Sequence, residues 1–96
     1  MKRRGRFLPD LYVMARILLA LADGRSKREV ALISGLNYSR FLQYVEYLRE
    51  KGLVTGEDEL RLTPKGAEAA ARLAELIREL TGDEPLQAKR RRGIGL

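Results

Sequence analysis

Four polar side chains recur on one face of a predicted helix over residues 38–51. They are Ser39, Arg40, Gln43 and Tyr47. An arginine can donate two hydrogen bonds to guanine O6 and N7, and a glutamine can pair with adenine N6 and N7. The first three lie near the N-terminal end of the helix, the end that usually enters the major groove. Their types and spacing predict a helix that contacts base edges of duplex DNA. The alternative is the solvated face of an ordinary amphipathic helix.

The same helix carries two carboxylates, Glu46 and Glu50, on its outward face. Only its first two turns are therefore expected to suit DNA, and Tyr47, one turn further on, is a candidate contact to a sugar or a phosphate. Three tyrosines, Tyr38, Tyr44 and Tyr47, also crowd this helix. Stacking on unpaired bases is one interpretation and would favour RNA binding. The other interpretation places these rings in the core and at its rim.

Three basic residues lie at the start of the preceding predicted helix. They are Arg25, Lys27 and Arg28. A helix in this position typically crosses the phosphate backbone, and its first N–H groups attract anions. The three side chains are therefore candidate phosphate contacts, and ordinary surface charge is the alternative.

The net charge of +6 lies entirely in the two ends of the chain. Residues 1–6 carry four basic groups, and residues 83–96 carry four basic and two acidic groups, whereas residues 7–82 are neutral. Basic ends attract polyanions such as nucleic acid without regard to sequence; the alternative is that they only aid solubility. We expect a basic arm over 1–7 and a basic, disordered tail over 83–96. The residues expected to contact DNA are Lys2, Arg3, Arg4, Lys89, Arg90, Arg91 and Arg92.

The composition argues against catalysis. The chain has neither cysteine nor histidine, so it lacks thiolate ligands and the usual general base. Its carboxylates are spaced as helix-surface charge partners, for instance Glu68 and Arg72. Neither a phosphate-binding glycine loop nor a metal-ligand cluster is present in the sequence. We expect no enzyme, no cofactor and no metal. Because no apolar run reaches about 20 residues, we expect a cytoplasmic protein without a membrane span.

Residues 26–51 predict the two helices and the turn that position these side chains. Ser26 and Glu29 have the spacing of a capping box. Gly35 suits a left-handed turn, and Asn37 can cap the next helix. A small residue, a turn glycine and an apolar anchor complete the helix-turn-helix pattern; they are Ala31, Gly35 and Phe41.

A first helix and a hairpin flank this motif. Pro9 is expected to begin the first helix, which ends at about Ala22. Its apolar surface is wide enough for two neighbours, its own domain and another subunit. Residues 53–55 and 60–62 predict two short strands joined by a turn. Three carboxylates lie at the tip of that turn, Glu57, Asp58 and Glu59. They would repel phosphate, so a basic protein partner at this tip is the alternative.

The last predicted helix covers residues 64–81, with Thr63 as its cap and Gly82 as its stop. Apolar residues repeat along it at three- and four-residue spacing. They are Ala70, Leu73, Leu76, Ile77 and Leu80. So short a helix must pack, either on the first helix of its own chain or on a second copy. We expect a dimer interface here.

In this order, the elements make the chain resemble the winged helix-turn-helix regulators. The residues that carry the resemblance are the run GLNYSRFLQYVEYLREKGLV, the hairpin and the LTPKGAE start of the last helix. More narrowly, over residues 8–80 the chain resembles the small archaeal winged-helix nucleoid proteins. The resemblance implies a mostly α fold with a small β-hairpin wing and an added C-terminal helix. It also implies duplex DNA binding by a homodimer that is joined through the C-terminal helices.

The sequence leaves the biological role open. A transcriptional regulator and an architectural chromatin protein, associated with the nucleoid, are equally compatible with these residues. The alternative class is a winged-helix docking module that binds protein at the acidic wing and does not contact DNA.

Overall fold

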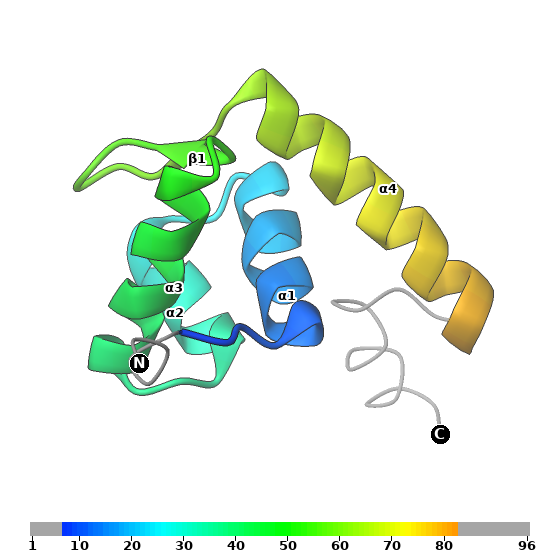
Figure 1. The fold of residues 1–96 in the computed structure, drawn as a ribbon, viewed down its shortest axis with the longest axis horizontal. Helices are drawn as coiled ribbons and strands as arrows, with labels where there is room; N and C mark the ends of the chain where they lie inside the picture. The colour runs from blue at the N-terminus through cyan, green and yellow to red at the C-terminus, as the bar shows by residue number, and fades with distance from the viewer. Residues whose placement is uncertain (1–6, 83–96) are drawn as a thin grey trace, which may run out of the picture.

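The computed structural model describes residues 7–82. This part contains helices α1 (Leu11–Ala22), α2 (Lys27–Ser34), α3 (Tyr38–Glu50) and α4 (Pro64–Thr81), and strands β1 (Val54–Thr55) and β2 (Arg61–Leu62). The strands pair antiparallel, with Val54 opposite Leu62 and Thr55 opposite Arg61. The predicted mostly α fold, with a small hairpin wing followed by a last helix, is confirmed (Figure 1).

The start of α1 differs from the expectation. Pro9 lies outside the helix, and Asp10 is the N-cap. The Asp10 carboxylate accepts hydrogen bonds from the N–H groups of Tyr12 (2.8 Å) and Val13 (3.2 Å). A side-chain acceptor satisfies the free amides of a first turn better than a proline that merely lacks one. The helix therefore begins at Leu11.

The caps expected for the next two helices are confirmed. Ser26 and Glu29 form a reciprocal capping box at the start of α2. Gly35 ends α2 with φ +76°, in the left-handed region that favours glycine. The Asn37 side chain accepts a hydrogen bond from the Arg40 N–H at 2.8 Å and begins α3. These caps fix the direction in which α3 leaves the turn.

The core lies where α1 meets α2, α3 and the hairpin. Its largest fully buried side chains are Phe41, Ile17, Leu18, Leu48 and Val30. α1 contacts α2, α4 and β2, and it lies between α3 and α4 in the ribbon (Figure 1). The expected contact of the first helix with its own domain is thus made by α2, α4 and β2, and its contact with another subunit stays a prediction. With α1 as its support, α3 exposes its polar face.

Candidate nucleic-acid interface

The N-terminal half of α3 presents its polar side chains to solvent, as the sequence predicts. Ser39, Arg40 and Gln43 are all exposed. The Arg40 guanidinium donates a hydrogen bond to the Gln43 side-chain oxygen at 2.8 Å. The pair is exposed, so a base edge can replace this hydrogen bond. The structure therefore brings together the two side chains best suited to pair with guanine and adenine.

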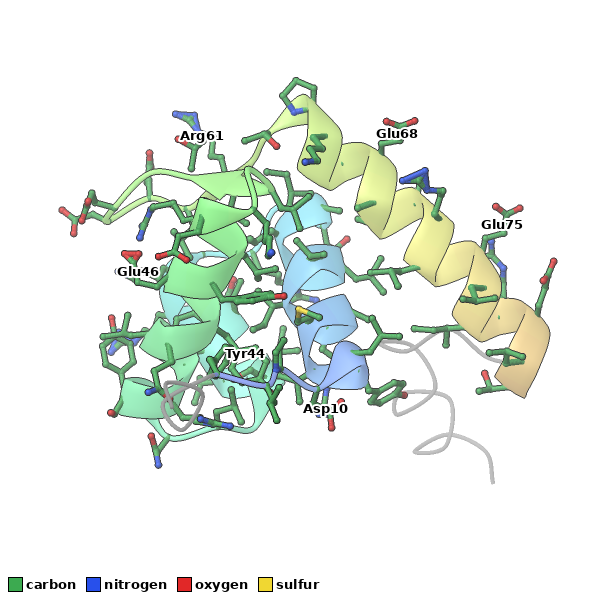
Figure 2. All side chains as sticks on the ribbon, in the orientation of Figure 1. Asp10, Tyr44, Glu46, Arg61, Glu68 and Glu75 are labelled. Atoms are coloured by element: carbon green, nitrogen blue, oxygen red, sulfur yellow. The ribbon has the colours of Figure 1, made fainter. Side chains whose placement is uncertain are left out.

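The C-terminal half of α3 is acidic. Glu46 and Glu50 are exposed, and Glu46 projects from the outer face of the helix (Figure 2). Arg49 contacts Glu46 at 2.9 Å and offsets part of this charge. An anionic backbone is thus favoured only at the first turns of α3.

The three tyrosines of α3 have different surroundings. Tyr44 is 2% exposed, and its hydroxyl accepts a hydrogen bond from the Asp10 N–H at 2.9 Å (Figure 2). Tyr47 is half-buried with its ring 5.5 Å from that of Phe7, and the Lys51 ammonium lies 5.2 Å from the Tyr47 ring centre. Tyr38 is exposed. Base stacking by all three rings is therefore wrong, because Tyr44 belongs to the core.

The three cations at the start of α2 also differ. Arg25 pairs with Asp23 at 3.1 Å, and the Lys27 ammonium donates to the Glu57 carbonyl at 3.0 Å. Arg28 is exposed. Exposed ion pairs contribute little, so a phosphate can compete for Arg25. The three remain candidate phosphate contacts.

A hollow of about 620 Å³ adjoins these cations and extends toward the wing tip. It is lined by Ser26, Lys27, Arg28, Ala31, Leu32, Tyr38 and Asp58. The Asp58 carboxylate thus shares a hollow with two of the candidate phosphate contacts.

Two cations from the helices hold the wing in place. The Arg49 guanidinium donates to the Gly56 carbonyl at 2.5 Å, and Lys27 donates to that of Glu57. Gly56 has φ +96°, and a Cβ there would overlap the Glu59 carbonyl oxygen, so glycine is required. The sequence suggested neither role, because Arg49 and Lys27 are separated from their acceptors by seven and 30 residues and no periodic pattern links them. Glu57, Asp58 and Glu59 are all exposed.

Within residues 7–82, no group of three or more acidic side chains is placed to hold a metal ion. No helix in that range is long and apolar enough to cross a membrane.

A family model described as "Winged helix-turn-helix" matches residues 3–81. The chain belongs to the winged helix-turn-helix family. Neither a curated protein nor a solved structure matches it. This fold is typical of DNA-binding regulators, and its members are generally not catalysts.

The residues expected at the dimer interface lie along α4 of this winged helix-turn-helix domain. Ala70 is 2% exposed in the core of its own chain, and Leu73 is half-buried against that core. The Ala70 side chain is thus buried by contacts within its own chain. Leu76 is 46% exposed and Leu80 74% exposed, while Ile77 is partly exposed.

The predicted tail contacts fall outside the described residues. They are Lys2, Arg3, Arg4, Lys89, Arg90, Arg91 and Arg92. Phe7, expected as the last residue of the arm, packs against the winged helix-turn-helix core. Phe7 is therefore part of the folded domain. The only sign of this in the sequence is that Phe7 is an aromatic residue directly after the basic run.

Proposed function

We propose that this protein binds duplex DNA with the first turns of α3 in the major groove. The observation that carries the proposal is the exposed Arg40–Gln43 pair at the N-terminal half of α3, in a family typical of DNA-binding regulators. Ser39 lies beside the pair, and Tyr47 lies one turn further on. A bidentate contact to one base is worth about 1–3 kcal/mol of discrimination against the wrong base.

Phosphate contacts would come from the start of α2 and from the basic ends of the chain. Arg25, Lys27 and Arg28 flank the α2 N-terminus, where the helix dipole also favours an anion. The logarithm of affinity falls by about 0.9 per tenfold increase in salt for each phosphate neutralised. Because residues 7–82 are neutral, most of this salt dependence should come from residues 1–6 and 83–96.

The protein would act in the cytoplasm, associated with the nucleoid, as a transcriptional regulator or as an architectural chromatin protein. Membership of the small archaeal winged-helix nucleoid group, which is a proposal from the sequence beyond the family shown, would suit the architectural role. The exposed Arg40 and Gln43 favour sequence-specific regulation.

A homodimer through α4 is part of the proposal. Leu76 and Leu80 are exposed in the C-terminal half of α4. A groove of about 300 Å³ adjoins Leu76. Apolar side chains from α1, α3 and α4 line most of it, with Arg72 as its charged member: Leu11, Met14, Leu18, Leu48, Leu53, Ala69, Arg72, Leu73 and Leu76. A second α4 would cover both features, and burial of apolar area favours that association.

The experiment is a salt series of binding to random duplexes and to pooled genomic fragments. The full chain is compared with a full-length variant whose tail lysines and arginines are replaced by glutamine. If the variant still prefers some fragments, α3 discriminates sequences and the protein is a regulator. If binding disappears with the tail charges and no fragment is preferred, the protein is architectural. Absence of binding by the native chain at low salt contradicts the proposal.

The alternative function is a docking module, and the wing is the observation that favours it. Its three carboxylates are exposed while Arg49 and Lys27 hold its backbone. A fixed acidic loop suits a basic protein surface. If the native chain binds no DNA, replacement of Glu57, Asp58 and Glu59 by their amides should abolish capture of a basic partner.

A further inference from the structure

Two aromatic rings lie against the Arg40 side chain on one flank of α3. The guanidinium carbon of Arg40 is 5.0 Å from the ring centre of Phe7 and 5.6 Å from that of Tyr44. Both distances are within the range of a cation–π contact, in which the face of the ring attracts the cation. The Arg40 guanidinium also donates to the Gln43 side-chain oxygen at 2.8 Å. Three separate contacts therefore act on the side chain expected to pair with guanine.

The two rings are themselves fixed in place. The Phe7 ring meets the Tyr44 ring edge-on, with 4.9 Å between centres and an angle of 83° between planes, an arrangement that aromatic pairs prefer. Tyr44 is buried, and its hydroxyl accepts a hydrogen bond from the Asp10 N–H at 2.9 Å (Figure 2). Phe7 also contacts Tyr47, with 5.5 Å between ring centres. An exposed arginine thus lies against an aromatic support that the core holds.

This support bears on how well Arg40 can contact a base. Immobilising a long side chain in a complex costs free energy, so a side chain that is already held loses less on binding. Arginine carries five N–H donors, and its one hydrogen bond to Gln43 leaves others free for a base edge. We propose that Phe7, backed by Tyr44, is a positioning residue that holds the Arg40 guanidinium for a bidentate contact to guanine. This inference rests on the proposed DNA binding.

The first experiment measures what the Phe7 ring contributes to binding. Phe7→Leu keeps an apolar side chain against the core but removes the ring, whereas Phe7→Tyr keeps the ring. The probe is the preferred genomic fragment, or the whole pool where none is preferred. We expect the leucine variant to bind it about threefold more weakly, as the loss of an exposed cation–π contact predicts. The tyrosine variant should bind like the native chain, and so should the control Leu8→Ala, at the exposed next position.

A modified base tests the contact to guanine itself. The same DNA is copied with 7-deazaguanine, which pairs normally but lacks the N7 acceptor in the major groove. The native chain should bind this copy about fivefold more weakly or worse, within the discrimination expected of a bidentate contact. Phe7→Leu should lose less than about twofold on this copy, because the ring and N7 act through the same arginine. A merely structural role of Phe7 would weaken binding to both copies equally.

The Arg40→Ala background provides the matched control. In this background Phe7→Leu should change affinity by less than about 1.5-fold, because two changes that act through one side chain are not additive. An equal effect of Phe7→Leu with and without Arg40 would overturn the proposal. A native chain that binds both copies of the DNA equally would also overturn it.

A measurement without DNA separates this inference from the proposed function. The face of an aromatic ring shields nearby protons, so the Arg40 Nε–H resonance should lie upfield of an ordinary arginine in the native chain and in Phe7→Tyr. It should move downfield in Phe7→Leu, and its absence from Arg40→Lys assigns it. An unchanged resonance in Phe7→Leu would overturn the proposal. If the resonance moves as expected but no variant binds duplex DNA, the proposed function fails while the support of Arg40 by Phe7 stands.

Discussion

Gly66 lies in the first turn of α4, where the helix backbone passes the Leu53 carbonyl. A Cβ at this position would overlap the Leu53 oxygen, which already accepts a hydrogen bond from the Thr63 N–H at 3.0 Å. In an exposed helix, alanine is better than glycine by about 1 kcal/mol. Here close packing reverses the preference. The chain can therefore pass from the wing into α4 along this path only with glycine at position 66.

We expect Gly66→Ala to lower the free energy of unfolding by about 1–3 kcal/mol, the usual cost of overpacking. Urea denaturation monitored by circular dichroism measures this. Ala71→Gly, at an exposed position of the same helix, serves as the control and should cost about 1 kcal/mol through helix propensity alone. A stabilised Gly66→Ala chain would show that α4 does not approach Leu53 closely.

Asn37 couples the stability of α3 to its proposed contacts with DNA. Its side chain caps the turn that carries Ser39 and Arg40. We expect Asn37→Ala to cost about 1 kcal/mol of stability and to weaken duplex binding, whereas Asn37→Ser should preserve both. Thermal unfolding measures the stability of both variants, and a binding titration measures their affinity for duplex DNA. An alanine variant as stable as the native chain would mean that the cap contributes nothing.

Local signals made the caps predictable. The side chains of Ser26, Asn37 and Thr63 bond to amides within three residues, so sequence spacing alone was sufficient. Phe7 and Gly66 were not predictable in this way. Their contacts join residues that are far apart in the chain, and no periodic pattern encodes such a pair.

The wing is the element that depends most on its neighbours. Each strand has two residues, and so short a hairpin is not stable alone in water. Hydrogen bonds from Arg49 and Lys27 to its backbone therefore contribute to its order. The sequence predicted the hairpin from its strand and turn residues. It did not identify these two donors, because both lie on helix surfaces where a cation is ordinary.

We expect Arg49→Ala to accelerate amide hydrogen exchange in residues 54–62, because local opening becomes easier when a backbone acceptor loses its partner. Exchange in α1 should stay unchanged. Arg61→Ala removes an exposed arginine from β2 and is the matched control. Hydrogen exchange read by mass spectrometry compares the two variants. Identical protection of the wing in both would contradict the role given to Arg49.

At the scale of the whole molecule, the two ends of α4 differ in burial. The part near Ala70 packs on its own chain, whereas Leu80 at the far end is exposed. Glu68 and Glu75 point away from α1 into solvent (Figure 2). The apolar repeat predicted a packed helix, but periodicity cannot tell an intrachain neighbour from a second copy. The structure places the first part within the chain, and a second copy is our proposal for the rest.

The native chain is accordingly expected to behave as a dimer in solution at micromolar concentration, and the dimer fraction should rise with protein concentration. Leu76→Glu combined with Leu80→Glu should give the monomer mass of 10.9 kDa, because buried charges at an apolar interface are costly. Light scattering after size exclusion measures both. A native chain of monomer mass at that concentration would exclude this dimer.

The central claim is that the first turns of α3 contact base edges, and the most direct test is the affinity of Arg40→Ala combined with Gln43→Ala for the preferred genomic fragment. Lys65→Ala removes one exposed positive charge at the start of α4, outside the proposed DNA and dimer contacts, and is the control. We expect the double variant to bind at least about tenfold more weakly, since each lost bidentate contact costs about 1–3 kcal/mol. The control should change affinity little. Unchanged affinity of the double variant would contradict the claim.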